Sequence, residues 1–443
     1  MKRISVIGAG HVGLVTAACF AELGHYVVCL DIDEERIAQI RAGVLPFHEP
    51  GLPELVQKHL DQRLWFTTDH DMAVHDAEFV FLAVATPTTS LGTADLRFVR
   101  SAARAVARAA NGTRPILVSK STAPVGITET LESILSAEAN GSEPLTVVAN
   151  PEFLREGTAV RDFMEPDRVV VGSTDIEARA AVGALYEPLG SPVLYTDIKT
   201  AEMVKYASNA FLATKISFIN EMAEICEKVG ADVRDVAQGM GLDPRIGPAF
   251  LQAGIGFGGS CLPKDVRALS HLAAIYGSHP QLLNTVLEIN VEQRRRLITR
   301  VRQVLGSLRG ARIAVLGLAF KAGTDDTRDS PAFDIIRLLE YEEACVRAYD
   351  PFAMDATRRL FPDIEYAEDA YDAATGCDAV ILATDWQEFK DLDLRQLHSI
   401  MRRPILIDGR NAWDAEKASD AGFIYFGMGV PDMAGAQAQG LTA

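Results

Sequence analysis

The stretch Gly8-Ala9-Gly10-His11-Val12-Gly13 decides the fold of this 443-residue chain. It closes the first apolar run, residues 4–8, and opens a helical pattern, which is the context of a GxGxxG dinucleotide-binding fingerprint. The glycines permit a tight turn, and unpaired N–H groups at the start of the helix attract a pyrophosphate. The residues predicted to bind the dinucleotide here are Gly8, Gly10, Val12 and Gly13.

A carboxylate at the end of the next apolar run indicates which dinucleotide is bound. Asp31 lies about 20 residues beyond the glycines, where a carboxylate accepts both ribose hydroxyls and repels a 2′-phosphate. This favours NAD over NADP, whereas Arg36 nearby is the feature that would favour NADP. A simple glycine turn is the alternative, but strand, glycines, helix and acidic strand end together predict an NAD site.

Outward from this stretch, β-branched runs alternate with helical patterns. The runs typical of buried parallel strands are residues 4–8, 26–31, 77–85, 115–120 and 146–150 in the first part, and 312–316, 344–350, 379–384 and 404–408 in the last. Between them, residues 200–230 contain no proline and carry apolar residues at helical spacing. We predict an α/β protein with two Rossmann-like doubly wound domains, 1–199 and 307–443, joined by a helical domain, 200–306, that contains a long central helix.

Charge and cysteine content restrict the partners and the compartment. The chain has 43 Lys and Arg against 60 Asp and Glu, a net charge of −17, which argues against nucleic acid or a membrane surface but allows a local basic pocket. Six cysteines without a CxxC pair predict neither a disulfide framework nor a metal site, and indicate a reducing cytoplasm. No segment has the roughly 18 uncharged apolar residues of a membrane span.

Hydroxyl and acidic residues end three strands on one predicted sheet edge. Thr86 and Thr122 each precede a proline by one or two residues, and either could belong to an ordinary turn. Glu152 and Glu156, in Asn150-Pro151-Glu152-Phe153-Leu154-Arg155-Glu156-Gly157, would share a face if the segment were helical, and paired acids can relay a proton. By spacing alone, a solvated turn with Arg155 as counter-ion is the favoured interpretation.

Lys205 and Asn209 lie one turn apart on the predicted long helix. A lysine on a solvated helix face is the usual case. Because the neighbours of Lys205 are small or apolar, we expect partial desolvation and a lowered pKa, which suits proton transfer or the binding of a developing alkoxide.

The sharpest signal is Gly254-Ile255-Gly256-Phe257-Gly258-Gly259-Ser260-Cys261-Leu262-Pro263-Lys264-Asp265. Four glycines would let the backbone wrap around a ligand, and Pro263 suits a first helical turn, which places Cys261 at a helix N-terminus beside Lys264. Both features stabilise a thiolate. Asp265 could position a water or take a proton. The cysteines expected to be inert core residues are Cys19, Cys29, Cys226, Cys345 and Cys377.

The last domain carries cations at strand ends. Lys321 follows one predicted strand and Arg410 another, and residues 324–330 are rich in charges and hydroxyls. These features favour a second, phosphate-bearing ligand, although surface loops carry such residues routinely.

A dinucleotide site, a nucleophilic cysteine, a helix lysine and paired acids indicate oxidation of an alcohol past the aldehyde. Hydride leaves a primary alcohol, and the Cys261 thiolate adds to the carbonyl. A second hydride leaves the thiohemiacetal, and water hydrolyses the thioester, so that two NAD are consumed per turnover.

These motifs resemble the nucleotide-sugar 6-dehydrogenases, the UDP-glucose/GDP-mannose dehydrogenase family, over residues 1 to about 430. The distinctive segments are NPEFLREG, KYASNAF, GFGGSCLPKD and GLAFK. The resemblance implies two Rossmann-like domains around a helical dimer core, and oxidation of UDP-glucose to UDP-glucuronate. It implies catalytic roles for Cys261, Lys205, Asp265, Thr122, Glu152 and Asn209. It implies NAD contacts at Asp31, Arg36, Thr86, Thr122, Glu156, Lys264 and Arg328. It implies nucleotide-sugar contacts at Glu152, Phe153, Leu154, Lys205, Asn209, Phe257, Gly258, Lys321 and Arg410, with Arg245 reaching from a partner subunit of a homodimer.

Two residues depart from the family pattern: Ala85 is a small steric change at the cofactor, and Leu262 leaves the identity of the nucleotide sugar open. Ala85 stands where members often have glycine, and Leu262 stands where many UDP-glucose enzymes have phenylalanine and GDP-mannose relatives have leucine. GDP-mannose, UDP-N-acetylmannosamine and TDP-glucose are therefore alternative substrates. Two hypotheses from other classes are a non-catalytic NAD and nucleotide-sugar sensor and a two-electron 2-hydroxyacid dehydrogenase that uses Lys205 and Asn209.

Overall fold

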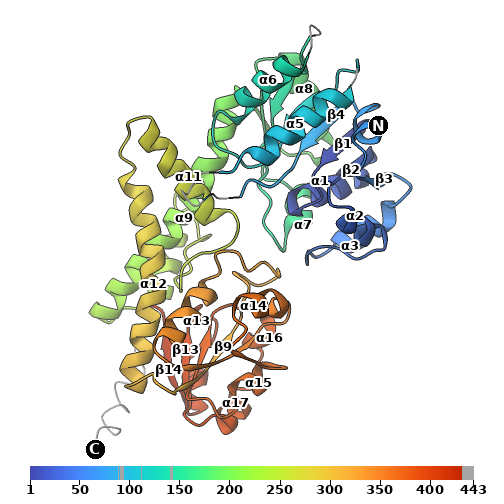
Figure 1. Ribbon diagram of the computed structural model, residues 1–443. Coiled ribbons are helices and arrows are strands. Elements are labelled where there is room, and N and C mark those ends of the chain that lie inside the picture. The colour runs from blue at the N-terminus through green and yellow to red at the C-terminus, as the bar shows by residue number, and fades with distance from the viewer. Residues whose placement is uncertain (88, 90–93, 111, 140–142, 432–443) are drawn as a thin grey trace, which may run out of the picture. The chain divides into compact units, whose positions relative to one another are not determined.

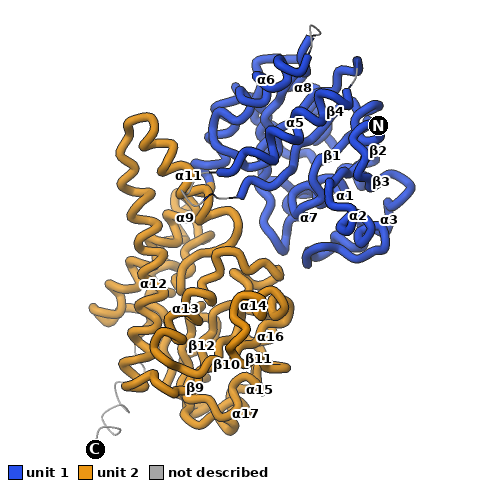
Figure 2. The backbone as a smooth tube through the Cα atoms, viewed as in Figure 1, with its two compact units in different colours: residues 1–208 blue, residues 209–443 orange. Residues whose placement is uncertain are grey.

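The computed structural model describes residues 1–87, 89, 94–110, 112–139 and 143–431 (Figure 1). The chain divides into two compact units, Met1–Ser208 and Asn209–Ala443 (Figure 2). The three-domain division at residues 199 and 306 stays a prediction. From its Gly- and Ala-rich sequence we predict that the tail beyond Pro431 is mobile, but it lies outside the described residues.

The first unit is built on an eight-stranded sheet in the order β3-β2-β1-β4-β5-β6-β7-β8. Neighbouring strands are parallel except β6 and β7, which pair antiparallel. The strands are β1 Arg3–Ile7, β2 Tyr26–Leu30, β3 Leu64–Thr67, β4 Phe79–Leu82, β5 Ile116–Ser119, β6 Val147–Ala149, β7 Val169–Gly172 and β8 Val193–Thr196. The order of the first six is that of a doubly wound dinucleotide-binding sheet, so the predicted fold class is confirmed.

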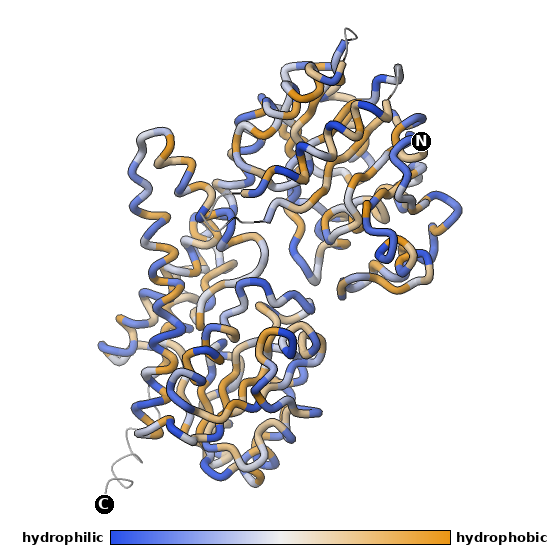
Figure 3. Tube along the Cα trace, viewed as in Figure 1, coloured by the Kyte–Doolittle hydropathy of each residue, from blue (hydrophilic) through white to orange (hydrophobic). Residues whose placement is uncertain are grey.

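Helices cover both faces of this sheet. They are α1 His11–Glu22, α2 Glu34–Arg41, α3 Leu52–His59, α4 His70–Val74, α5 Arg97–Ala110, α6 Ile127–Glu138, α7 Ala159–Met164 and α8 Ile176–Ala184, followed by the short 3₁₀ helix η1 Glu187–Leu189. Because side chains alternate along a strand, Phe79 and Phe81 of β4 enter one core while Val80 and Leu82 enter the other. The strands accordingly form the hydrophobic interior of the unit (Figure 3).

A single helix, α9 Ile198–Val229, runs through the boundary between the units and confirms the helix predicted over residues 200–230. Proline is absent from its 32 residues, so no turn loses its backbone hydrogen bond. Ala201, Lys205 and Asn209 follow one another at one-turn intervals, and all three are buried.

The second unit repeats the strand order of the first six strands of unit 1. Its parallel sheet has the order β11-β10-β9-β12-β13-β14. The strands are β9 Arg312–Leu316, β10 Cys345–Tyr349, β11 Glu365–Tyr366, β12 Ala379–Leu382, β13 Ile405–Asp408 and β14 Ile424–Gly427. The helices are α10 Val233–Gly241, α11 Leu262–Ile275, α12 Gln281–Leu305, α13 Pro331–Tyr341, α14 Met354–Leu360, α15 Ala370–Ala374, α16 Gln387–Lys390, α17 Leu394–Ile400 and α18 Ala415–Asp420.

The carboxylate that follows β10 is saturated by donors from its own unit. Asp350 is 1% exposed. Its Oδ2 accepts from Leu318 N, Ala319 N and Trp386 Nε1, and its Oδ1 accepts from Phe352 N and Ala353 N, all at 2.7–3.0 Å. Five donors fill the roughly four lone-pair positions of a carboxylate. Asp350 therefore serves the packing of this unit.

All nine predicted strands form, and five strands were missed: β3, β7, β8, β11 and β14. The Val169-Val170-Val171 run of β7 carries a strong apolar signal, whereas β8 is a half-exposed edge strand and β11 has only two residues. No helix among the described residues is long and apolar enough to cross a bilayer.

Candidate functional site

The glycine turn after β1 has one open position between two packed ones. Gly8 has φ +107°, and an added Cβ would lie 2.6 Å from Ala83 O, whereas a Cβ on Gly13 would overlap Gly8 O. A Cβ on Gly10 would meet no atom within 4 Å. Gly10 is also the N-cap of α1 and provides no side-chain cap, so the first N–H groups of the helix remain available to an anion. This turn fits a dinucleotide pyrophosphate at Gly10.

Asp31 lies beside this turn, as the sequence predicts. Its Oδ2 accepts from Ala9 N at 2.7 Å and from Arg36 Nη1 at 3.1 Å, and its Oδ1 accepts from Asp33 N at 3.1 Å. Three donors leave acceptor capacity on this carboxylate, and the Arg36 side chain is 38% exposed. Asp31 can therefore still accept a ribose hydroxyl.

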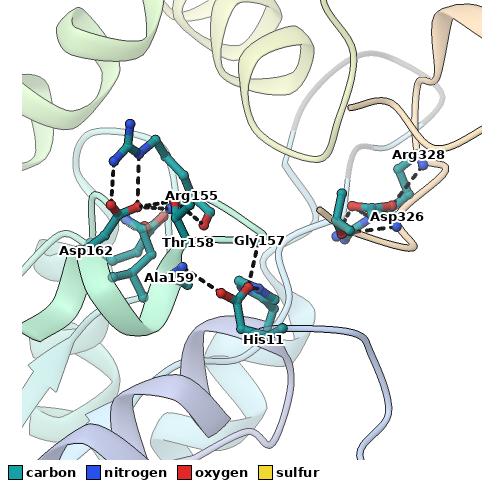
Figure 4. Close-up of polar contacts among 12 residues, drawn as sticks. His11, Arg155, Gly157, Thr158, Ala159, Asp162, Asp326 and Arg328 are labelled. Carbon is teal, nitrogen blue, oxygen red and sulfur yellow. Dashed lines mark hydrogen bonds and ion pairs between the residues drawn. The ribbon is translucent and has the colours of Figure 1, made fainter. Parts of the chain in front are cut away.

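Glu49 connects the glycine turn to the start of α7, and the residues that it contacts, His11, Gly157 and Ala159, are labelled in Figure 4. Its Oε2 lies 2.8 Å from His11 Nε2 and accepts from Gly157 N at 2.7 Å, while its Oε1 accepts from Ala159 N at 2.7 Å. The Glu49 side chain is fully buried. Glu49 was not among the predicted site residues, because no local motif marks it.

The strand ends of the first unit bring together Thr122, Glu152 and Lys205, which we name the Glu152 cluster. Lys205 Nζ lies 3.0 Å from Glu152 Oε1, and the two side chains are 4% and 3% exposed. Thr122 Oγ1 donates to the same oxygen at 3.1 Å, and Leu154 N donates to Glu152 Oε2 at 2.6 Å. Thr86 Oγ1 donates to Thr122 O at 2.6 Å. Thr86, Thr122 and Glu152 therefore form one connected network with Lys205 of α9.

The solvated-turn interpretation of the segment 150–157 is wrong for Glu152, and so is the shared helical face. The segment is not helical, since α7 begins at Ala159. Arg155 pairs with Asp162 at 2.5 Å rather than with a glutamate of the segment (Figure 4). Glu156 is half-buried. Residue spacing did not predict Asp162 as the partner of Arg155, because we considered only counter-ions within one turn of the segment.

The electrostatics of the cluster keep Glu152 charged. Burial by itself would raise the pKa of Glu152, but Lys205, the Leu154 N–H and, farther away, Lys120 together hold this pKa below its ordinary value. Beside the pair, the Phe153 ring lies 5.4 Å from Lys205 Nζ and carries the Arg168 guanidinium 3.6 Å from its centroid. Lys205 is desolvated as expected, and Glu152 is the charge that compensates it.

Cys261 lies where the sequence predicts, at the N-cap of α11, with Pro263 in the first turn. It is half-buried, and Ser260 Oγ lies 3.5 Å from its Sγ. Cys19, Cys29, Cys226 and Cys377 are buried, and burial raises the pKa of each thiol. Cys345 is exposed at the start of β10, so its assignment to the core is wrong.

The glycines of the segment 254–259 pack closely against other parts of the protein. A Cβ on Gly254, Gly256, Gly258 or Gly259 would collide with Gly409 O, Asn290 Oδ1, Asp329 O or the Phe320 ring, respectively. All four glycines are buried. Their function is therefore to let the loop that precedes Cys261 lie against the rest of its unit, which fixes the position of the thiol.

Asp265 is the centre of a second polar cluster. Its Oδ1 accepts from Lys264 Nζ and its Oδ2 from Asn209 Nδ2, both at 2.6 Å. Asp265 is fully buried. Because Asp265 belongs to the first turn of α11 and Asn209 to α9, the pair fastens the Cys261 helix to the long helix.

Asn290 and Arg294 of α12 hold the backbone of Phe257. Phe257 N donates to Asn290 Oδ1 at 2.7 Å, and Phe257 O accepts from Asn290 Nδ2 at 3.0 Å and from Arg294 Nη2 at 2.9 Å. Gly258, the other substrate contact predicted here, can pass Asp329 only because it has no side chain. No sequence signal connects α12 to this loop, and both residues were missed.

The remaining cationic side chains predicted to contact ligands differ in how far they are already bonded to other groups of the protein. Arg410 donates to three carbonyls, Ala383 O at 2.7 Å, Gly256 O at 3.0 Å and Phe320 O at 3.3 Å. Burial lowers the pKa of Arg410 to about 10. Lys321 Nζ lies 5.6 Å from the Phe320 centroid. Arg328 pairs with Asp326 (Figure 4), and Arg245, whose side chain is 87% exposed, pairs with Asp243.

Comparison with known proteins gives matches along most of the chain. Residues 2–190 match the NAD binding domain of the UDP-glucose/GDP-mannose dehydrogenase family, residues 199–292 its central domain and residues 314–415 its UDP binding domain. UDP-glucose 6-dehydrogenase TuaD of Bacillus subtilis (strain 168) is 47% identical over 439 residues, which cover 99% of this chain and 95% of that protein.

Solved structures of enzymes with related names are also similar to this chain. A UDP-glucose dehydrogenase from the hyperthermophilic archaeon Pyrobaculum islandicum has a TM-score of 0.91 and 40% identity, covering 97% of this chain and 98% of that one. A UDP-D-ManNAc dehydrogenase from Pyrococcus horikoshii has a TM-score of 0.86 and 30% identity, covering 97% and 100%.

The glycine geometry generates a prediction about two alanine variants. Gly10→Ala should keep the wild-type melting temperature but weaken NAD binding at least about tenfold, because its methyl group enters the open space over the turn. Gly13→Ala should lower the free energy of unfolding by about 1–3 kcal/mol, because its methyl group overlaps Gly8 O. Thermal melts and NAD titration by calorimetry measure both effects. Equal affinity of Gly10→Ala and wild type for NAD would contradict the placement of the pyrophosphate.

Proposed function

Because the chain belongs to the UDP-glucose/GDP-mannose dehydrogenase family, we propose that it oxidises the C6 alcohol of UDP-glucose to the carboxylate of UDP-glucuronate with two NAD per turnover. The chain is an NAD-dependent dehydrogenase. A nucleotide sugar is its class of substrate.

The choice of UDP-glucose rests on how the relatives rank by sequence identity to this chain. The relatives named for UDP-glucose are closer in sequence to this chain than the UDP-D-ManNAc dehydrogenase, although all cover nearly the whole chain. This order favours UDP-glucose despite Leu262, which GDP-mannose relatives share. The sensor and 2-hydroxyacid hypotheses have no comparable support.

Bound NAD supplies the hydride acceptor for both oxidations. In this proposal the residues that hold it are Gly8, Gly10, Val12, Gly13, Asp31, Arg36, Thr86, Thr122, Glu156, Lys264 and Arg328. The open position at Gly10 and the remaining acceptor capacity of Asp31 support the first part of this set.

Cys261 is the proposed nucleophile. The N-terminus of α11 favours its thiolate, and the half-buried position leaves Sγ accessible. After the first oxidation, Sγ bonds to C6 of the aldehyde and the carbonyl oxygen takes up a proton, which gives a thiohemiacetal. The second oxidation gives a thioester. Lys205 Nζ and Asp265 transfer the protons of these steps, and the Asn209 amide helps to hold the oxyanion.

Hydrolysis of the thioester releases the acid and restores the thiol. Glu152 and Thr122 place the attacking water in this proposal, and Glu152 takes its proton. The low pKa of Glu152 keeps it a carboxylate at neutral pH, so it is ready to accept. Lys205 balances its charge during the attack.

The nucleotide sugar is proposed to contact Glu152, Phe153, Leu154, Lys205, Asn209, Phe257, Gly258, Lys321 and Arg410, together with Arg245 of a second copy of the chain. Asn290 and Arg294 support this set by fixing Phe257. Arg410 is already bonded to three carbonyls, so its contribution would be to hold the walls of the pocket as much as to pair with phosphate.

A homodimer in a reducing cytoplasm completes the proposal. Phe211, Phe218 and Ile225 of α9 recur every seven residues and are 64%, 41% and 48% exposed. Seven-residue spacing places them on one face of the helix, and a second copy of the chain would cover that stripe. A reducing compartment keeps the Cys261 thiol available.

A substrate panel tests the reaction itself. With UDP-glucose as the limiting substrate, we expect two NADH for each sugar consumed, because alcohol-to-acid oxidation removes four electrons. Initial rates with GDP-mannose, UDP-N-acetylmannosamine and TDP-glucose should be lower. A stoichiometry of one NADH, or no NADH with any nucleotide sugar, would contradict the proposal.

Replacing the nucleophile tests the covalent steps. Cys261→Ser should reduce release of free acid by more than about 100-fold, because the serine hydroxyl is a far weaker nucleophile than a thiolate. Cys345→Ser is the matched control and should retain wild-type turnover, because that thiol is exposed at the start of β10. Product analysis by mass spectrometry makes the measurement. Acid release by Cys261→Ser at the wild-type rate would exclude the thioester.

A substitution in the exposed apolar stripe of α9, formed by Phe211, Phe218 and Ile225, tests the homodimer. Phe218→Glu should halve the mass measured by light scattering, because a charge at the centre of an apolar interface remains unpaired. Tyr341→Glu, at an 84% exposed position outside α9, should leave the mass unchanged. A wild-type chain that is monomeric at micromolar concentration would refute the homodimer.

A further inference from the structure

A second buried lysine lies next to the Glu152 cluster and is unused by the proposed reaction. Lys120 follows β5, two residues before Thr122, and is 4% exposed. Its Nζ donates to Asn150 Oδ1 at 3.1 Å and to Tyr186 OH at 3.3 Å. These acceptors are neutral, which is unusual for an ammonium group removed from water.

The groups around Lys120 form a closed triangle. Tyr186 OH donates to Asn150 Oδ1 at 2.6 Å, and Asn150 Nδ2 donates to Val170 O at 2.9 Å. The Tyr186 and Phe163 rings contribute their faces, with centroids 5.6 and 6.0 Å from Nζ. Lys120 was not among the predicted site residues, although it ends the predicted strand 115–120.

Lys120 and its hydrogen-bond partners affect Glu152 in two ways, through the backbone and through charge. Asn150 is two residues before Glu152 in the chain, so the bond from Lys120 fixes the end of β6 from which Glu152 projects. The charge of Lys120 also acts directly on Glu152, together with the charge of Lys205. Burial lowers the pKa of Lys120 to about 8, partly offset by Glu152, so it remains mainly protonated at neutral pH.

We propose that Lys120 is a positioning residue for the reaction: its buried ammonium group fixes the strand ends that present Thr122 and Glu152, and places a second positive charge next to the Glu152 cluster. The inference rests on the proposed function, in which Glu152 accepts a proton from water. The charged or titratable groups that act on Glu152 are Lys205 from α9 and Lys120 from the end of β5. Those that act on Lys120 are Glu152, Lys205 and the hydroxyl of Tyr186, which follows α8.

The sign of the effect follows from the low pKa of Glu152. Loss of the Lys120 charge removes one of the interactions that oppose burial, so the pKa of Glu152 rises. The acid limb of the kcat profile, where Glu152 becomes protonated, should then move to higher pH. A lysine that only filled space would alter stability and leave this limb in place.

The experiment measures kcat against pH for wild type and four variants. Lys120→Met should move the acid limb upward by about 0.5–1 pH unit. Lys120→Gln, which keeps a donor for Asn150 and Tyr186 but carries no charge, should move it in the same direction and serves if the Met variant does not fold. Lys120→Arg should restore the wild-type limb. Tyr186→Phe is the matched control, because it breaks the triangle and keeps the charge, and its limb should not move.

Two outcomes would overturn the inference: an unmoved limb in both neutral variants, or an equal shift in Tyr186→Phe. Glu152→Gln separates this failure from failure of the proposed function. If Glu152→Gln retains the wild-type acid limb, then Glu152 is not the group that titrates, and its proposed role is wrong. A wild-type chain that forms no NADH with UDP-glucose would refute the function itself.

Discussion

The buried ion pair between Lys205 and Glu152 is the interaction on which the rest of the first unit depends. Removing two charges from water costs several kcal/mol for each ion, and their attraction compensates only when the geometry is good and the other polar atoms are satisfied. Both conditions hold here, since Glu152 also accepts from the Thr122 hydroxyl and the Leu154 N–H. The pair constrains the ends of β5 and β6 and a turn of α9 together.

The next buried polar residue of α9 makes a similar contact within the second unit. One turn beyond Lys205, Asn209 donates to Asp265, which belongs to the helix that Cys261 caps. Both proposed catalytic carboxylates are thus held by polar side chains: Glu152 by Lys205 and Thr122, and Asp265 by Asn209 and Lys264. Little is left to loop conformation alone. Preorganisation of this kind limits the reorganisation needed when charge develops during a reaction.

Local sequence patterns predicted the structural features that depend on neighbouring residues, but they did not predict contacts made by tertiary packing. The glycine turn, Asp31, the long helix and Cys261 at a helix N-terminus depend on residues within a few positions, and each forms as expected. The partner of Arg155 and the carbonyls that bind Arg410 are set by tertiary packing, which spacing does not encode. The glycines before Cys261 are of the same kind: the sequence shows that the backbone comes close to something there, but not which protein atoms lie in the Cβ directions.

The strand-ending acids of the two sheets illustrate how far a fold determines a site. Asp31 and Asp350 follow equivalent strands, β2 and β10, of sheets with the same strand order. Three donors engage the first and five the second, of which one is the Trp386 indole. A motif scan that counts acidic residues after second strands would therefore report two ribose sites in this chain. Counting the free lone pairs instead leaves one candidate ribose site, at Asp31. The carboxylate of Asp350 is already occupied by donors from the protein, so its role is structural although it follows the equivalent strand.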